Sequence, residues 1–226
     1  MRGLKILVVA CCLVSVVGLG YAKMALQADP LSRLFDGNRL FVADTPAKKD
    51  LGQTRRAELV RGQSPFATVV TCSDSRVAPE YIFDQGLGDI FVVRVAGNVI
   101  EPTTLGSIEY AAEHLHTPLL VIMGHSQCGA VKAAVEAKGN PEGNIGAIVK
   151  KILPAVRTAK KAGKGEEETL DLAIKENVRN TYKEIMKSPV VRHLTHEGKL
   201  KIVAAEYHLK DGKVETIELP SGHKHH

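Results

Sequence analysis

Two short segments of the chain carry side chains that suit a metal ion. Cys72, Asp74 and Arg76 alternate in the first segment, and His125 and Cys128 stand three residues apart in the second. Thiolate sulfur and imidazole nitrogen are the ligands that zinc prefers in tetrahedral sites. Three such ligands leave a fourth position open, which is typical of a catalytic zinc site. We therefore predict that Cys72, His125 and Cys128 bind one zinc ion per chain.

Asp74 and Arg76 have a separate predicted task beside this site. Asp74 lies two residues from Cys72, so its carboxylate can fill the fourth position or stand next to it. Arg76 can bind a carboxylate through two parallel hydrogen bonds. Gly129, directly after Cys128, would permit a tight approach of the backbone. We expect Asp74 and Arg76 to act as a catalytic dyad.

Each of the two segments follows a predicted strand. Residues 66–71 form an apolar, β-branched run before Cys72, and the apolar run of residues 118–123 ends at Gly124 before His125. Strands alternate with helices and no tight hairpin joins them, which favours parallel pairing. Ligands of open α/β sheets bind in the crevice outside the carboxyl ends of the strands. The two segments should therefore converge there.

The rest of the pattern predicts a single α/β domain whose mostly parallel sheet has about four strands plus an antiparallel edge strand, flanked by helices. An N-terminal helical arm (about 29–62) precedes a sheet core (about 66–219). Further strands are expected at 90–95, at 201–207 and, after the Asp211–Gly212 turn, at 214–219. Helices are expected from Asp29–Pro30, at 49–61 and 81–84, from a Thr103–Thr104 cap to about 115, at 130–137, 145–162 and 167–186, and after Ser188–Pro189.

Composition argues for a globular domain and against nucleic acid as a partner. The chain has 226 residues, 44% of them hydrophobic and 24% charged. Trp is absent and aromatic residues make up 4%, so stacking surfaces for single strands are scarce. The formal net charge is +5, and the basic stretch 150–164 is followed by three glutamates, which is typical of a solvated helix face.

The first 22 residues are typical of a secretory signal peptide. Residues 1–5 are basic, residues 6–22 are uncharged and mostly apolar, and Gly20 and Ala22 are small residues at the −3 and −1 positions of a cleavage site. We expect cleavage after Ala22, which leaves residues 23–226 as a periplasmic or secreted protein with no membrane contact. An uncleaved anchor and lipoprotein cleavage before Cys11 are the alternatives.

Removal of residues 1–22 would leave Cys72 and Cys128 as the only cysteines. In an oxidising compartment two cysteines suggest a disulfide bond. A bridge between them would stabilise the fold by about 4 kcal/mol through loop closure. It would leave His125, Asp74 and Arg76 without a common role, so we favour zinc and keep a disulfide-bonded scaffold as the alternative.

These residues carry a resemblance to the β-class carbonic anhydrases. Cys-x-Asp-x-Arg at 72–76 followed by His-x-x-Cys at 125–128 is the signature of that family, and the similarity covers about residues 31–219. The resemblance implies a zinc lyase that reversibly hydrates carbon dioxide to bicarbonate and a proton. Together with the predicted signal peptide it indicates an exported, bacterial member of the family. It also implies substrate-binding roles for Gln85 and for the backbone at Gly129.

The resemblance further implies a homodimer or tetramer whose N-terminal helices embrace the partner, which would cover the apolar side of the helix from Asp29. In the implied mechanism, zinc-bound hydroxide is oriented by the Asp74–Arg76 dyad. Some bacterial members carry Trp where this chain has Val69, as part of a non-catalytic bicarbonate pocket that is linked to Asp capping the zinc. We therefore expect an open site at neutral pH, with water or hydroxide as the fourth ligand, and Asp74 as a ligand only in a closed state.

Two other functions stay open at this level. The same zinc site could hydrolyse carbonyl sulfide or carbon disulfide, because access to the pocket and not the ligand set decides between these gases. The chain could also be a non-catalytic scaffold that binds zinc or carries a disulfide bond. Measurement of metal content and titration of free thiols separate these alternatives, because one zinc per chain with no disulfide bond favours the enzyme.

Overall fold

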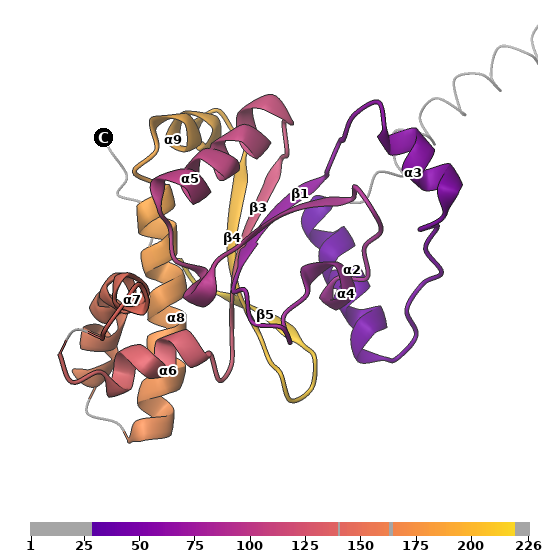
Figure 1. Cartoon of the computed structure of the whole chain (residues 1–226). Coiled ribbons are helices and arrows are strands. Elements are labelled where there is room, and N and C mark those ends of the chain that lie inside the picture. Colours follow the sequence, from indigo (N-terminus) through magenta and orange to yellow (C-terminus); the bar gives the residue numbers. More distant parts are fainter. Residues whose placement is uncertain (1–28, 140, 163–164, 220–226) are drawn as a thin grey trace, which may run out of the picture.

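Five strands form one sheet in the order β2-β1-β3-β4-β5 (Figure 1). The computed structural model describes residues 29–139, 141–162 and 165–219. The first four strands are parallel and the last pairs antiparallel with β4. The predicted mostly parallel sheet with an antiparallel edge strand is thereby confirmed. The strands are β1 (Ala67–Thr71), β2 (Ile90–Arg94), β3 (Leu119–His125), β4 (Lys201–Tyr207) and β5 (Val214–Ile217).

Helices cover both faces of the sheet (Figure 1). Leu34 of α2 and Ile82 of α4 pack on one face against Val69 and Val121. The other face, which includes Ile122, packs against helices α5, α8 and α9. The helical elements are α2 (Pro30–Val42), α3 (Gln53–Leu59), α4 (Pro79–Ile82), α5 (Pro102–Glu109), α6 (Gly129–Glu136), α7 (Ile145–Lys160), α8 (Glu166–Ile185) and α9 (Pro189–His196), with the short turns η1 (Ala96–Asn98) and η2 (Tyr110–His114).

Strands β1 and β3 lie at the centre of the sheet, and every residue of both is buried. Their continuous apolar, β-branched sequences fit this position, because a parallel strand between two helical layers has no solvent-facing side. Each of these strands ends next to one of the predicted metal-binding segments. The most buried part of the fold therefore positions the site.

The prediction that Gly124 ends the third strand was wrong. Strand β3 continues through Gly124 to His125, and Gly124 is paired with Glu206 of β4. A Cβ atom at position 124 would lie 2.7 Å from Val178 Cγ2 of α8. The glycine therefore permits close packing of α8 on the sheet and does not break the strand.

The predicted cap at Thr103–Thr104 was also displaced. Helix α5 begins at Pro102 with Glu101 as its N-cap, and the Glu101 N–H donates to Thr104 Oγ1 at 2.7 Å. Proline favours the first helical position because its missing N–H is not needed there. Helix α3 is shorter than expected, since only Gln53–Leu59 are helical.

Helix α2 is attached to its own chain. Leu34 is fully buried, so part of the apolar side of this helix packs within the chain, whereas Leu40 and Val42 of the same helix are exposed. Asn38 Nδ2 donates to the carbonyls of Ile82 at 3.1 Å and Gly212 at 2.9 Å, and Asn38 Oδ1 accepts from Val214 N–H. Helix α3, in contrast, has no buried residue.

Residues 1–28 and 220–226, and with them the predicted signal peptide, lie outside the described residues. Among the helices that are described, none combines the length and apolar character needed to cross a membrane.

Candidate metal centre

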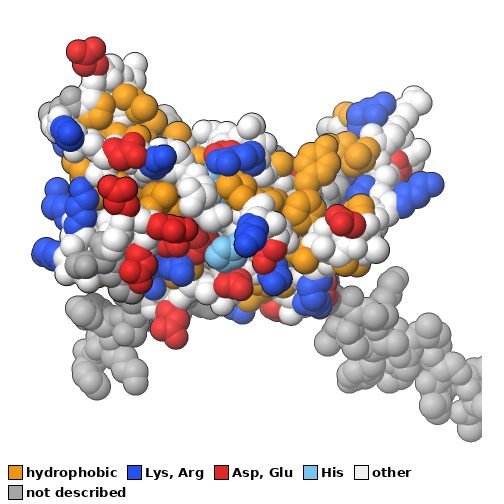
Figure 2. Space-filling view, turned by 90° about the horizontal axis from the view of Figure 1, so that it is seen from below, with side chains coloured by type: hydrophobic (Ala, Val, Ile, Leu, Met, Phe, Trp, Pro, Cys, Tyr) orange, Lys and Arg blue, Asp and Glu red, His pale blue; other side chains and the backbone are white. Residues whose placement is uncertain are grey.

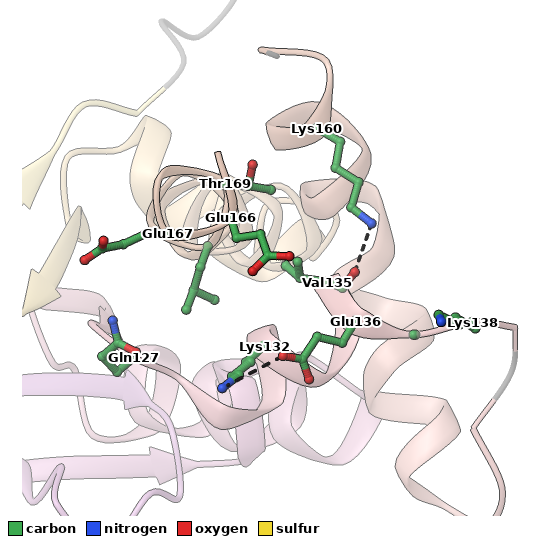
Figure 3. A pocket seen from close by; sticks show the side chains of 11 residues that line it. Gln127, Lys132, Val135, Glu136, Lys138, Lys160, Glu166, Glu167 and Thr169 are labelled. Carbon is green, nitrogen blue, oxygen red and sulfur yellow. Dashed lines mark hydrogen bonds and ion pairs between the residues drawn. The ribbon is translucent and has the colours of Figure 1, made fainter. Parts of the chain in front are cut away.

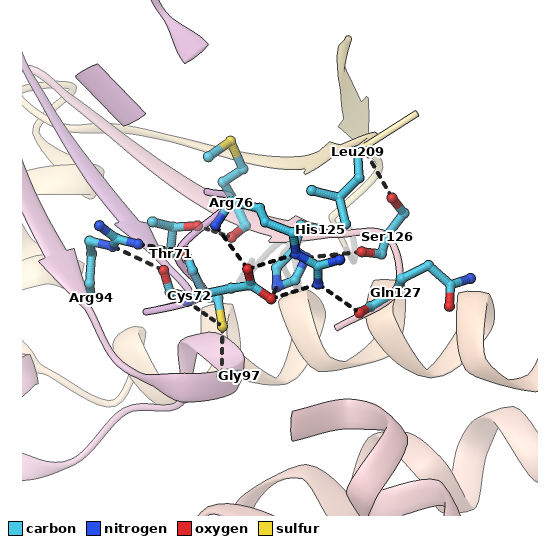
Figure 4. Close-up of polar contacts among 11 residues, drawn as sticks. Thr71, Cys72, Arg76, Arg94, Gly97, His125, Ser126, Gln127 and Leu209 are labelled. Atoms are coloured by element: carbon cyan, nitrogen blue, oxygen red, sulfur yellow. Dashed lines mark hydrogen bonds and ion pairs between the residues drawn. The ribbon is translucent and has the colours of Figure 1, made fainter. Parts of the chain in front are cut away.

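The three predicted zinc ligands meet at the carboxyl end of the sheet. Figure 4 shows two of them, Cys72 and His125. Cys72 follows β1, His125 is the last residue of β3, and Cys128 immediately precedes α6. Their ligand atoms all lie within 4.8 Å of one another. The side chains are buried, with exposed fractions of 4%, 0% and 1%, and both cysteines are free thiols. The chain thus brings together two sulfur donors and one nitrogen donor.

His125 offers one nitrogen for which the described residues provide no hydrogen-bond partner. Its Nδ1 lies 2.9 Å from the Ser126 carbonyl, so this nitrogen carries the proton and donates it. The opposite atom, Nε2, is buried and has no hydrogen-bond partner among the described residues. A histidine whose Nδ1–H is fixed by a carbonyl presents a bare Nε2, which is the usual arrangement of a metal ligand.

Cys72 is placed to be a thiolate. Its Sγ accepts from Gly97 N–H at 3.2 Å and from Asp74 N–H at 3.4 Å. The pKa of Cys72 is lowered to about 4, first by the hydrogen bond from Cys128 and then, against the effect of burial, by His125 and these two backbone donors. Backbone N–H groups that point at a sulfur atom stabilise its negative charge.

Cys128 behaves in the opposite way, because the two thiols share one proton. Its pKa is raised by its hydrogen bond to Cys72 and by burial, although the backbone N–H groups of Val131 and Ala130 at the start of α6 oppose this. Two adjacent buried thiols cannot both ionise unless a cation compensates them. The pair of sulfurs and the bare Nε2 of His125 therefore fit a zinc ion.

Asp74 is fixed next to these donors by Arg76. Asp74 Oδ1 accepts from Arg76 Nε at 3.0 Å and from Arg76 N–H at 3.0 Å, and Oδ2 accepts from Nη2 at 2.8 Å. Asp74 Oδ2 also lies 3.9 Å from His125 Nε2. The guanidinium hydrogen bonds of Arg76 hold the pKa of Asp74 well below its usual range. The carboxylate is thus ionised and stands beside the metal-binding atoms.

Arg94 of β2 is a member of this site that the sequence analysis missed. Its Nε donates to the Cys72 carbonyl at 3.1 Å and its Nη2 donates to the Asp74 carbonyl at 2.7 Å. The pairing of Thr71 with Arg94 in neighbouring strands places this side chain where β1 ends. Only the strand register reveals this contact, since Arg94 is 22 residues from Cys72 in the chain.

The substrate-binding roles that the resemblance implied for Gln85 and Gly129 stay predictions. Gln85 Nε2 donates to the Phe83 carbonyl at 2.5 Å and lies against Gly37 of α2. No contact of Gln85 with the three metal-binding side chains occurs in the described part of the chain. A Cβ atom on Gly129 would meet nothing within 4 Å among the described residues.

A separate hollow of about 880 Å³ lies beside the metal centre, between α6, the end of α7 and the start of α8 (Figure 3). Gln127, which stands between the two ligands of the second segment, reaches its edge. Three lysines (Lys132, Lys138 and Lys160) and three glutamates (Glu136, Glu166 and Glu167) line it. This balance of charge favours neither cations nor anions, which separates the hollow in character from the buried sulfur and nitrogen cluster.

Comparison with known proteins agrees with this geometry. A sequence model of the carbonic anhydrase family matches residues 67–214. The carbonic anhydrase of Mycolicibacterium smegmatis is 44% identical over 186 residues, which cover 80% of this chain and 89% of that protein.

Two solved structures share the fold. The β-carbonic anhydrase of Coccomyxa has a TM-score of 0.69 and 26% identity, with coverage of 84% of this chain and 87% of that one. A structure from a study of two tetrameric β-carbonic anhydrases of Sordaria macrospora has a TM-score of 0.67 and 27% identity, with coverage of 72% and 85%. The chain belongs to the β-class carbonic anhydrase family and is a carbonic anhydrase.

Proposed function

We propose that the protein reversibly hydrates carbon dioxide to bicarbonate and a proton at a zinc ion held by Cys72, His125 and Cys128. The observation that carries this proposal is the pair of buried thiols and the unpartnered His125 Nε2 next to an ionised Asp74. Membership of the carbonic anhydrase family supports the reaction. The donor set supports zinc, because zinc favours sulfur and nitrogen ligands.

Cys72, His125 and Cys128 would hold the zinc ion, which would supply a Lewis acid that lowers the pKa of a coordinated water toward neutrality. The chain's own contribution is orientation. The Asp74 carboxylate is an acceptor only, since Arg76 prevents its protonation, so it accepts a hydrogen bond from the attacking water. That bond points an oxygen lone pair of the water away from Asp74 and toward the substrate carbon. The released proton passes to buffer.

Arg76 also supports the proposal that the site is open when the enzyme works. Both oxygens of Asp74 are engaged by the Arg76 side chain, which competes with any bond from this carboxylate to the metal. Val69, in the position where some family members carry Trp, is fully buried in the core. Asp74 would become a fourth ligand only after it releases Arg76.

Stopped-flow assays with carbon dioxide, carbonyl sulfide and carbon disulfide test this function against its nearest rival. We expect rapid hydration of carbon dioxide and little or no hydrolysis of the two sulfur compounds by the zinc-loaded enzyme. Hydrolysis of carbon disulfide without hydration of carbon dioxide would assign the site to the rival reaction. A zinc-loaded protein inactive on all three gases would support the non-catalytic scaffold.

We also propose that the enzyme is a homodimer, or a tetramer built from dimers. The N-terminal arm and the α4 region expose large apolar side chains, among them Leu51 at 54%, Val60 at 84% and Tyr81 at 76%. Figure 2 shows hydrophobic side chains along the notch between this arm and the rest of the molecule. Light scattering should give the mass of a dimer or tetramer, and Val60→Lys should shift it toward the monomer. A monomeric wild-type enzyme would contradict this proposal.

Export of the enzyme is a proposal that rests on residues 1–22 alone. A basic start, an apolar run and small residues before Lys23 are typical of a cleaved signal. Amino-terminal sequencing of the protein purified from its native cells should begin at Lys23. A chain that still begins at Met1 would contradict cleavage.

A further inference from the structure

We propose that Arg94 is a positioning residue of the metal centre. Its guanidinium fixes the backbone of the turn that carries Cys72 and Asp74 to the sheet. The metal-binding part of this inference depends only on the cysteine and histidine cluster, whereas its consequence for turnover rests on the proposed function.

The strand register puts Arg94 within reach of this turn. Strand β2 lies at the edge of the sheet next to β1, with Thr71 paired to Arg94. Val95 N–H donates to the Thr71 carbonyl at 3.1 Å, so the two strands remain in contact up to the start of the turn. The Arg94 side chain then extends past the end of β1 and reaches the carbonyls of residues 72 and 74 (Figure 4).

This bridge does something that the Asp74–Arg76 pair cannot do. Asp74 and Arg76 belong to the same short turn, and the hydrogen bond of Arg76 Nη2 to the Gln127 carbonyl, at 3.5 Å, ties this pair to the other ligand-bearing turn and not to a strand beside β1. Arg94 belongs to a strand, and its two hydrogen bonds set the spacing between the Cys72 and Asp74 backbones from outside the turn. It thereby sets where the Cys72 sulfur and the Asp74 carboxylate stand relative to each other.

The contacts also distinguish this role from charge compensation. Among the described residues Arg94 forms no ion pair, and both of its hydrogen bonds go to main-chain carbonyls. Two N–H groups in one rigid plane can bridge two carbonyls, whereas the single ammonium of lysine binds as a point charge. A lysine at position 94 should therefore keep the charge and lose most of the effect.

Arg192 provides a matched control. It is exposed like Arg94, and its Nη1 donates to two main-chain carbonyls, those of Met186 at 3.0 Å and Lys187 at 2.8 Å. These carbonyls lie between α8 and α9, far from the metal ligands in the sequence. Substitution of Arg192 therefore removes the same kind of contact without touching the turn at residues 72–76.

The test is the rate at which the zinc-loaded proteins release zinc to a coloured chelator. We expect Arg94→Ala and Arg94→Gln to release zinc about 10- to 100-fold faster than wild type, the effect typical of lost outer contacts of a metal site. The rate of zinc release from Arg94→Lys should be closer to the rates of these two variants than to that of wild type. Arg192→Ala should release zinc at the wild-type rate. Wild-type release from Arg94→Ala, or equally fast release from Arg192→Ala, would overturn the inference.

Two further readouts separate positioning from general loss of structure. The absorption bands of the cobalt-substituted protein should shift in Arg94→Gln, while circular dichroism stays that of wild type. In the hydration assay kcat should fall while KM stays nearly constant. If Arg94→Ala does not fold, the glutamine and lysine variants carry the test. Faster zinc release in a chain that never hydrates carbon dioxide would keep this inference and refute the proposed function.

Discussion

The two turns that supply the metal ligands are held in different ways. The turn at residues 72–76 depends on two guanidinium groups: Arg76, whose side chain is 54% exposed, and Arg94 on the edge strand. The turn at residues 125–128 is held from inside the fold. Ser126 N–H donates to the Tyr207 carbonyl at 2.9 Å, and Ser126 Oγ accepts from Leu209 N–H at 3.0 Å.

Because of this difference, substitutions in the first turn should affect mainly catalysis, and substitutions in the second turn should affect mainly stability. Water screens the exposed Arg76 guanidinium, so changes at Asp74 or Arg76 should alter chemistry more than the free energy of unfolding. The second turn continues a central strand against which α8 packs, so changes there should affect the whole fold. Four substitutions test this contrast, in order of decreasing expected effect.

Replacement of a metal-binding sulfur should have the largest effect. The serine hydroxyl that replaces the Cys72 thiol is not ionised at neutral pH, so the site loses a strong zinc ligand. We expect no stoichiometric zinc by elemental analysis and only background hydration of carbon dioxide. A Cys72→Ser protein that keeps one zinc per chain would contradict the assigned ligand set.

Asp74→Asn should retain zinc and lose activity by about 100-fold or more. A carboxylate accepts hydrogen bonds through both of its oxygens, whereas the amide of Asn accepts through its oxygen alone and donates through its nitrogen. Stability should change by less than about 1 kcal/mol. Asp36→Asn, which breaks the exposed pair of Asp36 with Arg39 on α2, is the control and should keep full activity. Full turnover in Asp74→Asn would refute the orienting role of this carboxylate.

The pH dependence of the same variant has a defined sign. The pKa of Asp74 is depressed in the folded protein, so its contribution to stability is present above the usual Asp value of about 3.9 and is lost as the pH falls below it. The difference in melting temperature between wild type and Asp74→Asn should therefore shrink in acid. A difference that grows in acid would exclude the Arg76 pair as its cause.

Gly124→Ala should disturb the second turn through the core. The new methyl group would lie 2.7 Å from Val178 Cγ2, so α8 must shift, at a cost of about 1–3 kcal/mol. Gly106→Ala is the matched control on α5, because a Cβ atom there meets nothing within 4 Å. It should stabilise the helix by up to about 1 kcal/mol. Denaturant unfolding gives the free energy of unfolding of both variants. Equal changes in Gly124→Ala and Gly106→Ala would show that close packing of α8 at Gly124 is not the cause.

Ser126→Ala should have the smallest effect. It removes the acceptor of Leu209 N–H and should lower the free energy of unfolding by about 1 kcal/mol. Zinc content and hydration rate should remain near those of wild type, because no metal ligand is changed. A large loss of activity at unchanged stability would show that this turn, too, acts mainly on the chemistry.

Sequence patterns predicted the sheet well because its central strands are long apolar runs that only a buried parallel position explains. They failed at Gly124, since a glycine that ends a strand and one that admits a helix look the same without the tertiary packing. The metal-binding residues were predictable from residue type and spacing. Arg94 was not, because its contacts with the Cys72 and Asp74 carbonyls exist only through the strand register. The substrate-binding role of Gln85, which the resemblance implied, stays a prediction.

Removal and return of zinc, followed by the rate of carbon dioxide hydration, test whether a zinc ion at Cys72, His125 and Cys128 carries the reaction. We predict one zinc per chain, loss of hydration when a chelator removes the metal under reducing conditions, and recovery on addition of zinc alone. Reduced Cys72 and Cys128 should become titratable thiols only in the metal-free protein. Metal-free protein that hydrates carbon dioxide at the original rate would show that zinc is not required for the reaction.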